Sequence, residues 1–259
     1  MYDHQAKKLN EQGTFKEIVV EISARQLSAK SETLRQMSMF LTQAVFMEVC
    51  VHPKPGLVTR HGSGAHTDMS ILTFAAGSAV LAKAFSDLQI LGMKHNGNYQ
   101  ELFGKVRRYG VSAEQELLRV TKGVNTQRGI LFAGGLLAAA AGAAMNKGLD
   151  SKALCSIVAE MTQGLTENEL AGLQADRPLT AGERLYQAYG ITGIRGEVEA
   201  GFPSVRQNGL PGLKEAFAKG AGLNDALVHA LVHLMTVVQD SNVIWRGGYA
   251  KLPFVQQRA

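Results

Sequence analysis

Residues 129–145 read GILFAGGLLAAAAGAAM, an uncharged run between Arg128 and Lys147. Its seventeen residues fall slightly short of the roughly 20 that a helix needs to cross a lipid bilayer. Glycine and alanine dominate the run, and small residues let neighbouring backbones approach closely. The run therefore predicts the central helix of a packed bundle rather than a membrane span.

Helical periodicity continues on both sides of this run. Leu34, Met37 and Leu41 recur at three- and four-residue steps before prolines at 53 and 55 end the pattern. Helices are predicted over 31–50, 70–91, 98–120, 126–147, 150–164, 180–189, 211–219 and 223–243. Loops are predicted over 51–69, 165–179 and 190–210. Long structured loops in a helical domain often carry function.

Capping residues support these boundaries. Asp150 and Asn224 stand at expected N-caps, and Gly148 and Gly220 stand where helices should end. The strand candidate, 17–22, lies in a weakly patterned region. We therefore predict an all-α, single-domain multi-helix bundle with long functional loops. Residues 1–30 would form an N-terminal arm, and residues 31–259 the helical domain.

Composition and charge favour some classes of protein over others. The chain has 27 basic and 22 acidic residues, a net charge of +5, which favours anionic partners such as phosphates. It has no basic run with interleaved aromatics, so nucleic-acid binding is not expected. Cys50 and Cys155 lie far apart, as is typical of reduced thiols in a cytoplasmic protein. The polar N-terminus lacks the apolar core of a signal peptide.

The first predicted loop offers groups that suit a phosphate. Prolines on both sides of Lys54 fix where its ammonium points. Gly64 permits backbone amides to approach a ligand closely. Glu48 ends an apolar helical face, so it is expected either to point inward or to lie exposed at the helix end.

Histidines occur in two settings. His66 and Asp68 fit a metal or acid–base pair, although Asp68 or Ser70 also fits as the cap of the next helix. His229 and His233 are four residues apart on a predicted helix, but the motif supplies no third zinc ligand. Structural or surface histidines are the favoured interpretation for the second pair.

Asn125 and Thr126 precede the small-residue helix. Either could cap it, or its N-terminus could hold a phosphate with Arg128 above. The chain has no P-loop, no dinucleotide-binding glycine motif after a strand and no nucleophile elbow. These absences argue against P-loop kinases, Rossmann dehydrogenases and α/β-hydrolases.

Two further segments are polar and rich in glycine. In the first, Glu183, Arg195 and Glu197 suit a charged ligand or magnesium, which takes one or two carboxylates plus phosphate oxygens. A solvated loop of salt bridges is the alternative. The second segment, near a predicted helix end, contains Asp240, Asn242, Arg246 and Gly248.

Together these segments resemble the triphosphoribosyl-dephospho-CoA synthase family over roughly residues 35–250. They are, in order, Glu48 with Pro53-Lys54-Pro55-Gly56-Leu57-Val58, Gly64-Ala65-His66-Thr67-Asp68-Met69, Asn125-Thr126 with Gly129, Gly193-Ile194-Arg195-Gly196-Glu197, Gly201-Phe202-Pro203, and Asp240, Asn242, Arg246 and Gly248. The resemblance implies a helical catalytic domain that transfers the 5-triphosphoribosyl group of ATP to the 2′-hydroxyl of 3′-dephospho-CoA and releases adenine. The product is the prosthetic-group precursor of an acyl carrier protein in citrate lyase or malonate decarboxylase, upstream of a holo-acyl-carrier-protein synthase.

The implied reaction assigns roles to these residues. An oxocarbenium-like transition state needs nearby negative charge, the attacking hydroxyl needs a base, and the triphosphate needs Mg²⁺ and cationic side chains. We expect catalytic roles for Asp68, Glu197 and His66, and magnesium binding by Glu48, Asp240 and Glu183. We expect substrate binding by Lys54, Gly64, Asn125, Thr126, Arg128, Arg195, Asn242, Arg246 and Gly248.

Three positions depart from the family pattern. Gln127 stands where the family usually has His, and Thr59 and Ser70 stand where it commonly has Asp. Two alternatives stay open: a magnesium-dependent nucleotide or ADP-ribosyl hydrolase, and a non-catalytic protein that binds CoA or nucleotide. The oligomeric state and the lyase system are also open.

Overall fold

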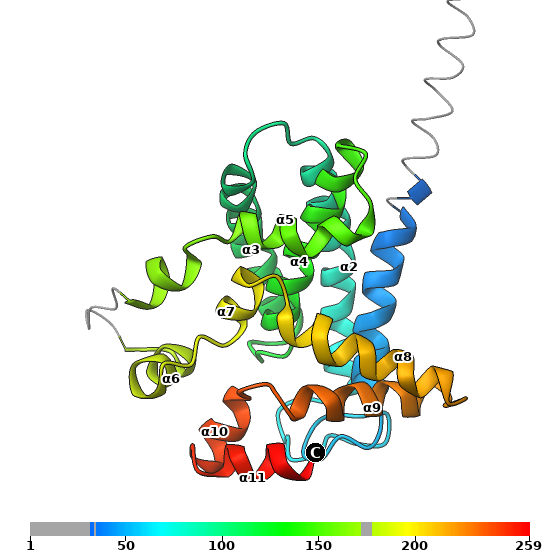
Figure 1. Cartoon of the computed structure of the whole chain (residues 1–259), viewed down its shortest axis with the longest axis vertical. Helices are drawn as coiled ribbons and strands as arrows, with labels where there is room; N and C mark the ends of the chain where they lie inside the picture. The colour runs from blue at the N-terminus through cyan, green and yellow to red at the C-terminus, as the bar shows by residue number, and fades with distance from the viewer. Residues whose placement is uncertain (1–31, 34, 172–177) are drawn as a thin grey trace, which may run out of the picture.

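The computed structural model describes residues 32, 33, 35–171 and 178–259, without the side chains of Asn242 and Arg246. Across these ranges the regular structure is helical, apart from an isolated bridge between Thr59 and Gly62, and the predicted all-α fold is confirmed (Figure 1). The strand candidate at 17–22 and the predicted arm lie outside the described residues.

Four helices running in alternating directions make the body of the molecule. They are a helix over 35–50, α2 (Ile71–Met93), α3 (Tyr99–Val120) and α4 (Arg128–Asn146). Alternation places the connections at 51–70 and 121–127 at the same end of the bundle, the lower end in Figure 1. Two of the predicted site segments therefore lie at one end of the core.

Contact between α2 and α4 is close because glycines face the neighbouring backbone. A Cβ added to Gly92 would lie 2.0 Å from the carbonyl oxygen of Ala139, and one added to Gly142 would lie 1.9 Å from that of Gln89. Ala138 to Ala141 are at most 2% exposed. By length and composition both helices could cross a membrane, but α4 is the buried core helix that its small residues predict.

The other elements follow the bundle. They are the 3₁₀ turn η1 (Ser151–Ala153), α5 (Leu154–Met161), the π turn η2 (Glu167–Ala171), α6 (Ala181–Tyr189), α7 (Ile194–Glu199), the π turn η3 (Val205–Gly209), α8 (Leu210–Ala218), α9 (Leu223–Met235), α10 (Ser241–Gly247) and α11 (Lys251–Arg258). α5 and α7 complete the main core. A smaller core of Leu185, Ile191, Ile244 and Leu252 joins α6, α10 and α11.

Several predicted boundaries are wrong. The helix expected over 223–243 is divided into α9 and α10, because Asp240 Oδ1 accepts a hydrogen bond from the Val243 amide (3.2 Å) and starts a new helix. The loops expected over 165–179 and 190–210 contain η2, α7 and η3. α11 was not predicted.

Two predicted N-caps are also wrong, whereas Asp150 is confirmed as the N-cap of η1. Gly222 is the N-cap of α9, and Gln127 is the N-cap of α4. Asn224 instead faces the loop over 51–69: its side-chain amide donates to the His52 carbonyl (2.7 Å), and its oxygen accepts from the His52 amide (3.1 Å). Asn224 therefore fastens this loop to α9.

Candidate active site

A cavity of about 320 Å³ opens between α3, α4 and α7. Apolar side chains form part of its wall: Leu88, Val106, Leu131 and Phe132. Charged side chains also line it: Arg107, Glu114, Arg128, Glu169 and Arg195. Three guanidiniums against two carboxylates leave the cavity with an excess of positive charge, which suits an anionic ligand.

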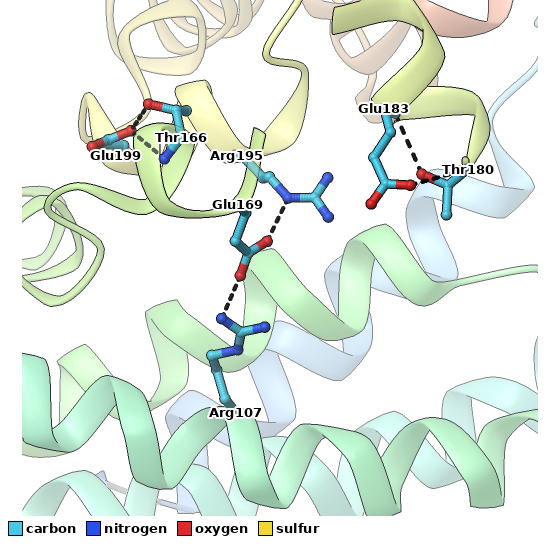
Figure 2. Close-up of polar contacts among 7 residues, drawn as sticks. All are labelled: Arg107, Thr166, Glu169, Thr180, Glu183, Arg195 and Glu199. Atoms are coloured by element: carbon cyan, nitrogen blue, oxygen red, sulfur yellow. Dashed lines mark hydrogen bonds and ion pairs between the residues drawn. The ribbon is translucent and has the colours of Figure 1, made fainter. Parts of the chain in front are cut away.

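Ion pairs hold these arginines in place. Arg195 Nε donates to Glu169 Oε2 (2.6 Å), and Arg107 pairs with the other oxygen of the same carboxylate (Figure 2). Arg128 Nε lies 2.7 Å from Glu114 Oε1. A guanidinium carries five N–H donors, so a pairing through one of them leaves others to bind phosphate oxygens.

Local sequence explains where two of the arginines lie. Arg128 is the first residue of α4, and Gly129 beside it also lines the cavity. The amide groups of a helix's first turn have no partner within the helix and favour anions. Arg195 is the second residue of α7 and follows Gly193, whose φ of 56° lies in the left-handed region that glycine adopts at little cost.

The structure thus brings together the predicted residues Arg128 and Arg195, which are far apart in the sequence. Sequence reasoning missed Arg107, Glu114 and Glu169. Arg107 belongs to an amphipathic helix, where a charged residue indicates a solvated face, and Glu169 falls in a predicted loop. No local signal pairs a residue at 107 with one at 169.

Lys54 and Glu48 are bonded to each other. Lys54 Nζ donates to Glu48 Oε1 (2.7 Å) and to the Glu48 carbonyl oxygen (2.5 Å), and its side chain is 4% exposed. The Glu48 side chain is 52% exposed. The ammonium therefore fixes the end of the helix over 35–50.

His66 and Asp68 lie near each other at the end of the same loop. His66 Nδ1 is 3.7 Å from Asp68 Oδ1, with the carboxylate side exposed and the imidazole mostly covered. Ser70, rather than Asp68, is the N-cap of α2. Gly64 lies against the loop's own backbone, because a Cβ there would meet the Leu57 carbonyl oxygen at 2.5 Å. Gly64 therefore allows the loop to fold closely against its own backbone.

Glu197 and Glu199, both in α7, each accept hydrogen bonds from backbone amides of neighbouring segments. Glu197 accepts hydrogen bonds from the amide and the hydroxyl of Ser204 (2.9 Å each). Glu199 accepts from the Gly164 amide (2.6 Å) and from the amide and hydroxyl of Thr166 (Figure 2). Partial burial raises the pKa of Glu199, but these hydrogen bonds outweigh it and hold that pKa below its ordinary value.

The predicted residues on α6 and α10 lie at helix ends. Glu183 is buried and forms a capping box with Thr180, whose amide donates to Glu183 Oε2 (2.7 Å). Asp240 starts α10, and Gly248 (φ 80°) follows its last residue. The side chains of Asn242 and Arg246 are outside the described set. α6 and α10 are in contact, so Glu183 and Asp240 belong to neighbouring elements.

The segment before α4 contains buried polar atoms. Asn125 is exposed, whereas Thr126 Oγ1 is buried and has no hydrogen-bond partner. Gln127 is 1% exposed and donates to Ser78 Oγ (3.1 Å). The other two positions that depart from the family pattern also have roles in the fold. Ser70 is the N-cap of α2, and Thr59 forms an isolated β-bridge with Gly62.

Comparison with known proteins identifies relatives of the whole helical region. Residues 34–259 match the family model CitG, ATP:dephospho-CoA triphosphoribosyl transferase. A protein of Pectobacterium carotovorum subsp. carotovorum (strain PC1), named probable 2-(5''-triphosphoribosyl)-3'-dephosphocoenzyme-A synthase, is 41% identical over 88% of this chain and 76% of that protein. No solved structure matches the chain significantly.

Two further relatives carry the same name without the word probable. The protein of Pectobacterium atrosepticum is 39% identical over 88% of this chain and 76% of its own length. That of Klebsiella pneumoniae is 37% identical over 91% of this chain and 79% of its own length. Because the family model and these relatives cover most of its length, the chain belongs to the ATP:dephospho-CoA triphosphoribosyl transferase family.

Proposed function

We propose that the cavity between α3, α4 and α7 holds the triphosphate of ATP during the transfer of its triphosphoribosyl group to 3′-dephospho-CoA. The transfer reaction itself follows from family membership. The location rests on one observation, the convergence of Arg107, Arg128 and Arg195 on one cavity. Cationic donors fixed by ion pairs neutralise a triphosphate without having to reorganise.

The size of the cavity limits what it holds. Ligand pockets commonly measure about 300–1,000 Å³, and at about 320 Å³ this one is near the lower bound. We assign it to the phosphates and ribose of ATP. Dephospho-CoA would approach from the lower end of the bundle, where the loop over 51–69 lies (Figure 1).

The bond changes define the groups that the site must supply. The bond from C1 of the ATP ribose to adenine breaks, and the 2′-hydroxyl of dephospho-CoA forms the new bond to C1. The hydroxyl proton passes to a base, and adenine leaves with a proton. Asp68 is our preferred base, because its carboxylate is exposed beside His66, whereas Ser204 donates to both oxygens of Glu197.

Magnesium would accompany ATP as part of this proposal. It takes oxygen ligands and commonly needs only one or two carboxylates besides phosphate oxygens and water. Of the three predicted ligands, Glu48 fits best, because it is half exposed and Lys54 holds its orientation. Glu183 and Asp240 both cap helices, so binding metal would compete with those caps.

The biological setting is also a proposal. The precursor made here would serve citrate lyase or malonate decarboxylase after a holo-acyl-carrier-protein synthase attaches it, and both steps would take place in the cytoplasm. The relatives' names support the biosynthetic role and leave the lyase open.

One assay tests the reaction. Purified protein is incubated with ATP, Mg²⁺ and 3′-dephospho-CoA, and the products are separated and weighed by mass spectrometry. We expect free adenine together with a dephospho-CoA adduct heavier by one triphosphoribosyl unit, and only when both substrates are present. Adenine without the adduct would favour the hydrolase alternative. Neither product from folded protein would refute the function proposed for this chain.

A further inference from the structure

A second cluster of potential ligands lies on α8 and α9. His229 and His233, one turn apart on α9, face Glu215 on α8. These residues do not line the arginine-bearing cavity. Sequence reasoning set the histidine pair aside for want of a third ligand, and the packing of α8 against α9 supplies it.

The distances between ligand atoms match those of a metal site. The two Nε2 atoms are 3.1 Å apart, and Glu215 Oε2 lies 3.8 Å from that of His229 and 3.9 Å from that of His233. A triangle with these sides has a circumradius of about 2.1 Å, which equals the Zn–N and Zn–O bond lengths of zinc proteins. An ion at this distance from all three atoms lies in their plane, so Glu215 Oε2 must move toward the histidines by roughly a few tenths of an ångström to give the tetrahedral geometry of zinc sites.

Neighbouring residues hold the ligands in this arrangement. Lys219 Nζ contacts Glu215 Oε1 (2.5 Å), which leaves Oε2 directed at the histidines. The ring of His233 lies against Gly212, where an added Cβ would come within 2.7 Å of it.

We propose that Glu215, His229 and His233 bind one Zn²⁺ ion, with water at the fourth position, and that the ion cross-links α8 to α9. Two imidazoles and a carboxylate form a donor set that zinc favours, and it differs from the all-oxygen set that Mg²⁺ prefers. The side chains are 35–44% exposed, so an ion can enter from solvent. In this structure the Nε2 atoms of the two histidines lie within hydrogen-bond distance of each other, so the one that carries a proton must lose it when a metal binds.

The test uses the full-length, untagged protein in the absence of nucleotide. Zn²⁺ is titrated in competition with a chromophoric chelator, and Co²⁺ is bound in parallel to record its visible spectrum. We expect one Zn²⁺ per chain, a visible Co²⁺ spectrum typical of four-coordination, and a rise in Tm when zinc is added. His229→Gln with His233→Gln should weaken zinc binding at least about 10-fold, since two of three protein ligands are lost.

Two variants keep the test specific. His52→Gln with His61→Gln removes the other adjacent histidine pair, whose rings lie 4.7 Å apart, and should bind zinc as the wild type does. Lys219→Gln keeps all three ligands and should still bind one Zn²⁺ per chain, although Glu215 loses the contact that orients it. Equal zinc affinity in the wild type and the His229/His233 variant, or no binding at micromolar Zn²⁺, would overturn the proposal. Neither result bears on the transferase assay.

Discussion

Individual arginines should control ATP binding. Arg195→Gln, Arg128→Gln and Arg107→Gln each remove one cation from the cavity, and a hydrogen bond to a charged group contributes roughly 1.5–3 kcal/mol. We expect each variant to raise the KM for ATP about 10- to 100-fold in steady-state kinetics. The KM for dephospho-CoA should change less.

Arg119→Gln is the matched control for these arginines. Arg119 pairs with Glu116 on the exposed side of α3, and its side chain is 71% exposed. Its replacement should leave both KM values unchanged. An unchanged KM for ATP in all three cavity variants would show that the triphosphate does not bind in this cavity.

Glu199 should contribute stability that depends on pH. Its pKa is lower in the folded chain than the ordinary value of 4.5, so its contribution is present above that value and is lost as pH falls through the folded pKa. Glu199→Gln should lower the free energy of unfolding at pH 7 by roughly 1–2 kcal/mol, because the hydrogen bonds to a charged acceptor are lost. Urea denaturation at pH 7 and below pH 4 would measure the difference, which should shrink in acid. If the difference in the free energy of unfolding between the wild type and Glu199→Gln grew in acid, the lowered pKa of Glu199 would be contradicted.

At the scale of elements, the contact between α2 and α4 should tolerate no extra methyl group. Gly142→Ala would put Cβ 1.9 Å from the Gln89 carbonyl oxygen, and overpacking of this kind typically costs about 1–3 kcal/mol. Gly104→Ala in α3 is the control, since its Cβ would lie 4.0 Å from the end of the Arg108 side chain. That change should stabilise the protein by up to about 1 kcal/mol through helix propensity. Thermal unfolding followed by circular dichroism should give shifts of opposite sign.

The attachment of the loop over 51–69 to α9 should depend on Asn224. Asn224→Ala removes its bonds to the His52 backbone and to Arg60 Nη1 (2.7 Å). We expect faster tryptic cleavage after the exposed Arg60, and a fall in kcat/KM because the same loop carries His66 and Asp68. Asn224→Asp keeps the hydrogen-bond acceptor and loses the donor, so its cleavage rate and kcat/KM should lie between those of the wild type and Asn224→Ala. Cleavage at the wild-type rate in Asn224→Ala would mean that other contacts hold the loop.

For the whole molecule, the sequence predicted those features of the fold that depend on which residues are buried. The small residues of α4 exist because its neighbours approach closely, and the same run predicts the bundle core. The break between α9 and α10 was missed, since Thr236-Val237-Val238 contains neither glycine nor proline. Arg128 and Arg195 stand next to glycines in recognisable segments. Arg107 pairs with Glu169, a tertiary contact that no local pattern encodes.

The N-terminal boundary of the catalytic domain can be tested by truncation. The family model begins at residue 34, and among the residues that the structure describes the main hydrophobic core lies within 41–202. A variant lacking residues 1–30 should therefore keep the wild-type Tm within about 2 °C and release adenine at an unchanged rate, because a loss below 0.5 kcal/mol shifts Tm by only that much. Differential scanning calorimetry and the adenine assay would measure both quantities. If Tm is kept while turnover is lost, the N-terminal arm contributes to the active site, and the catalytic domain extends beyond residues 31–259.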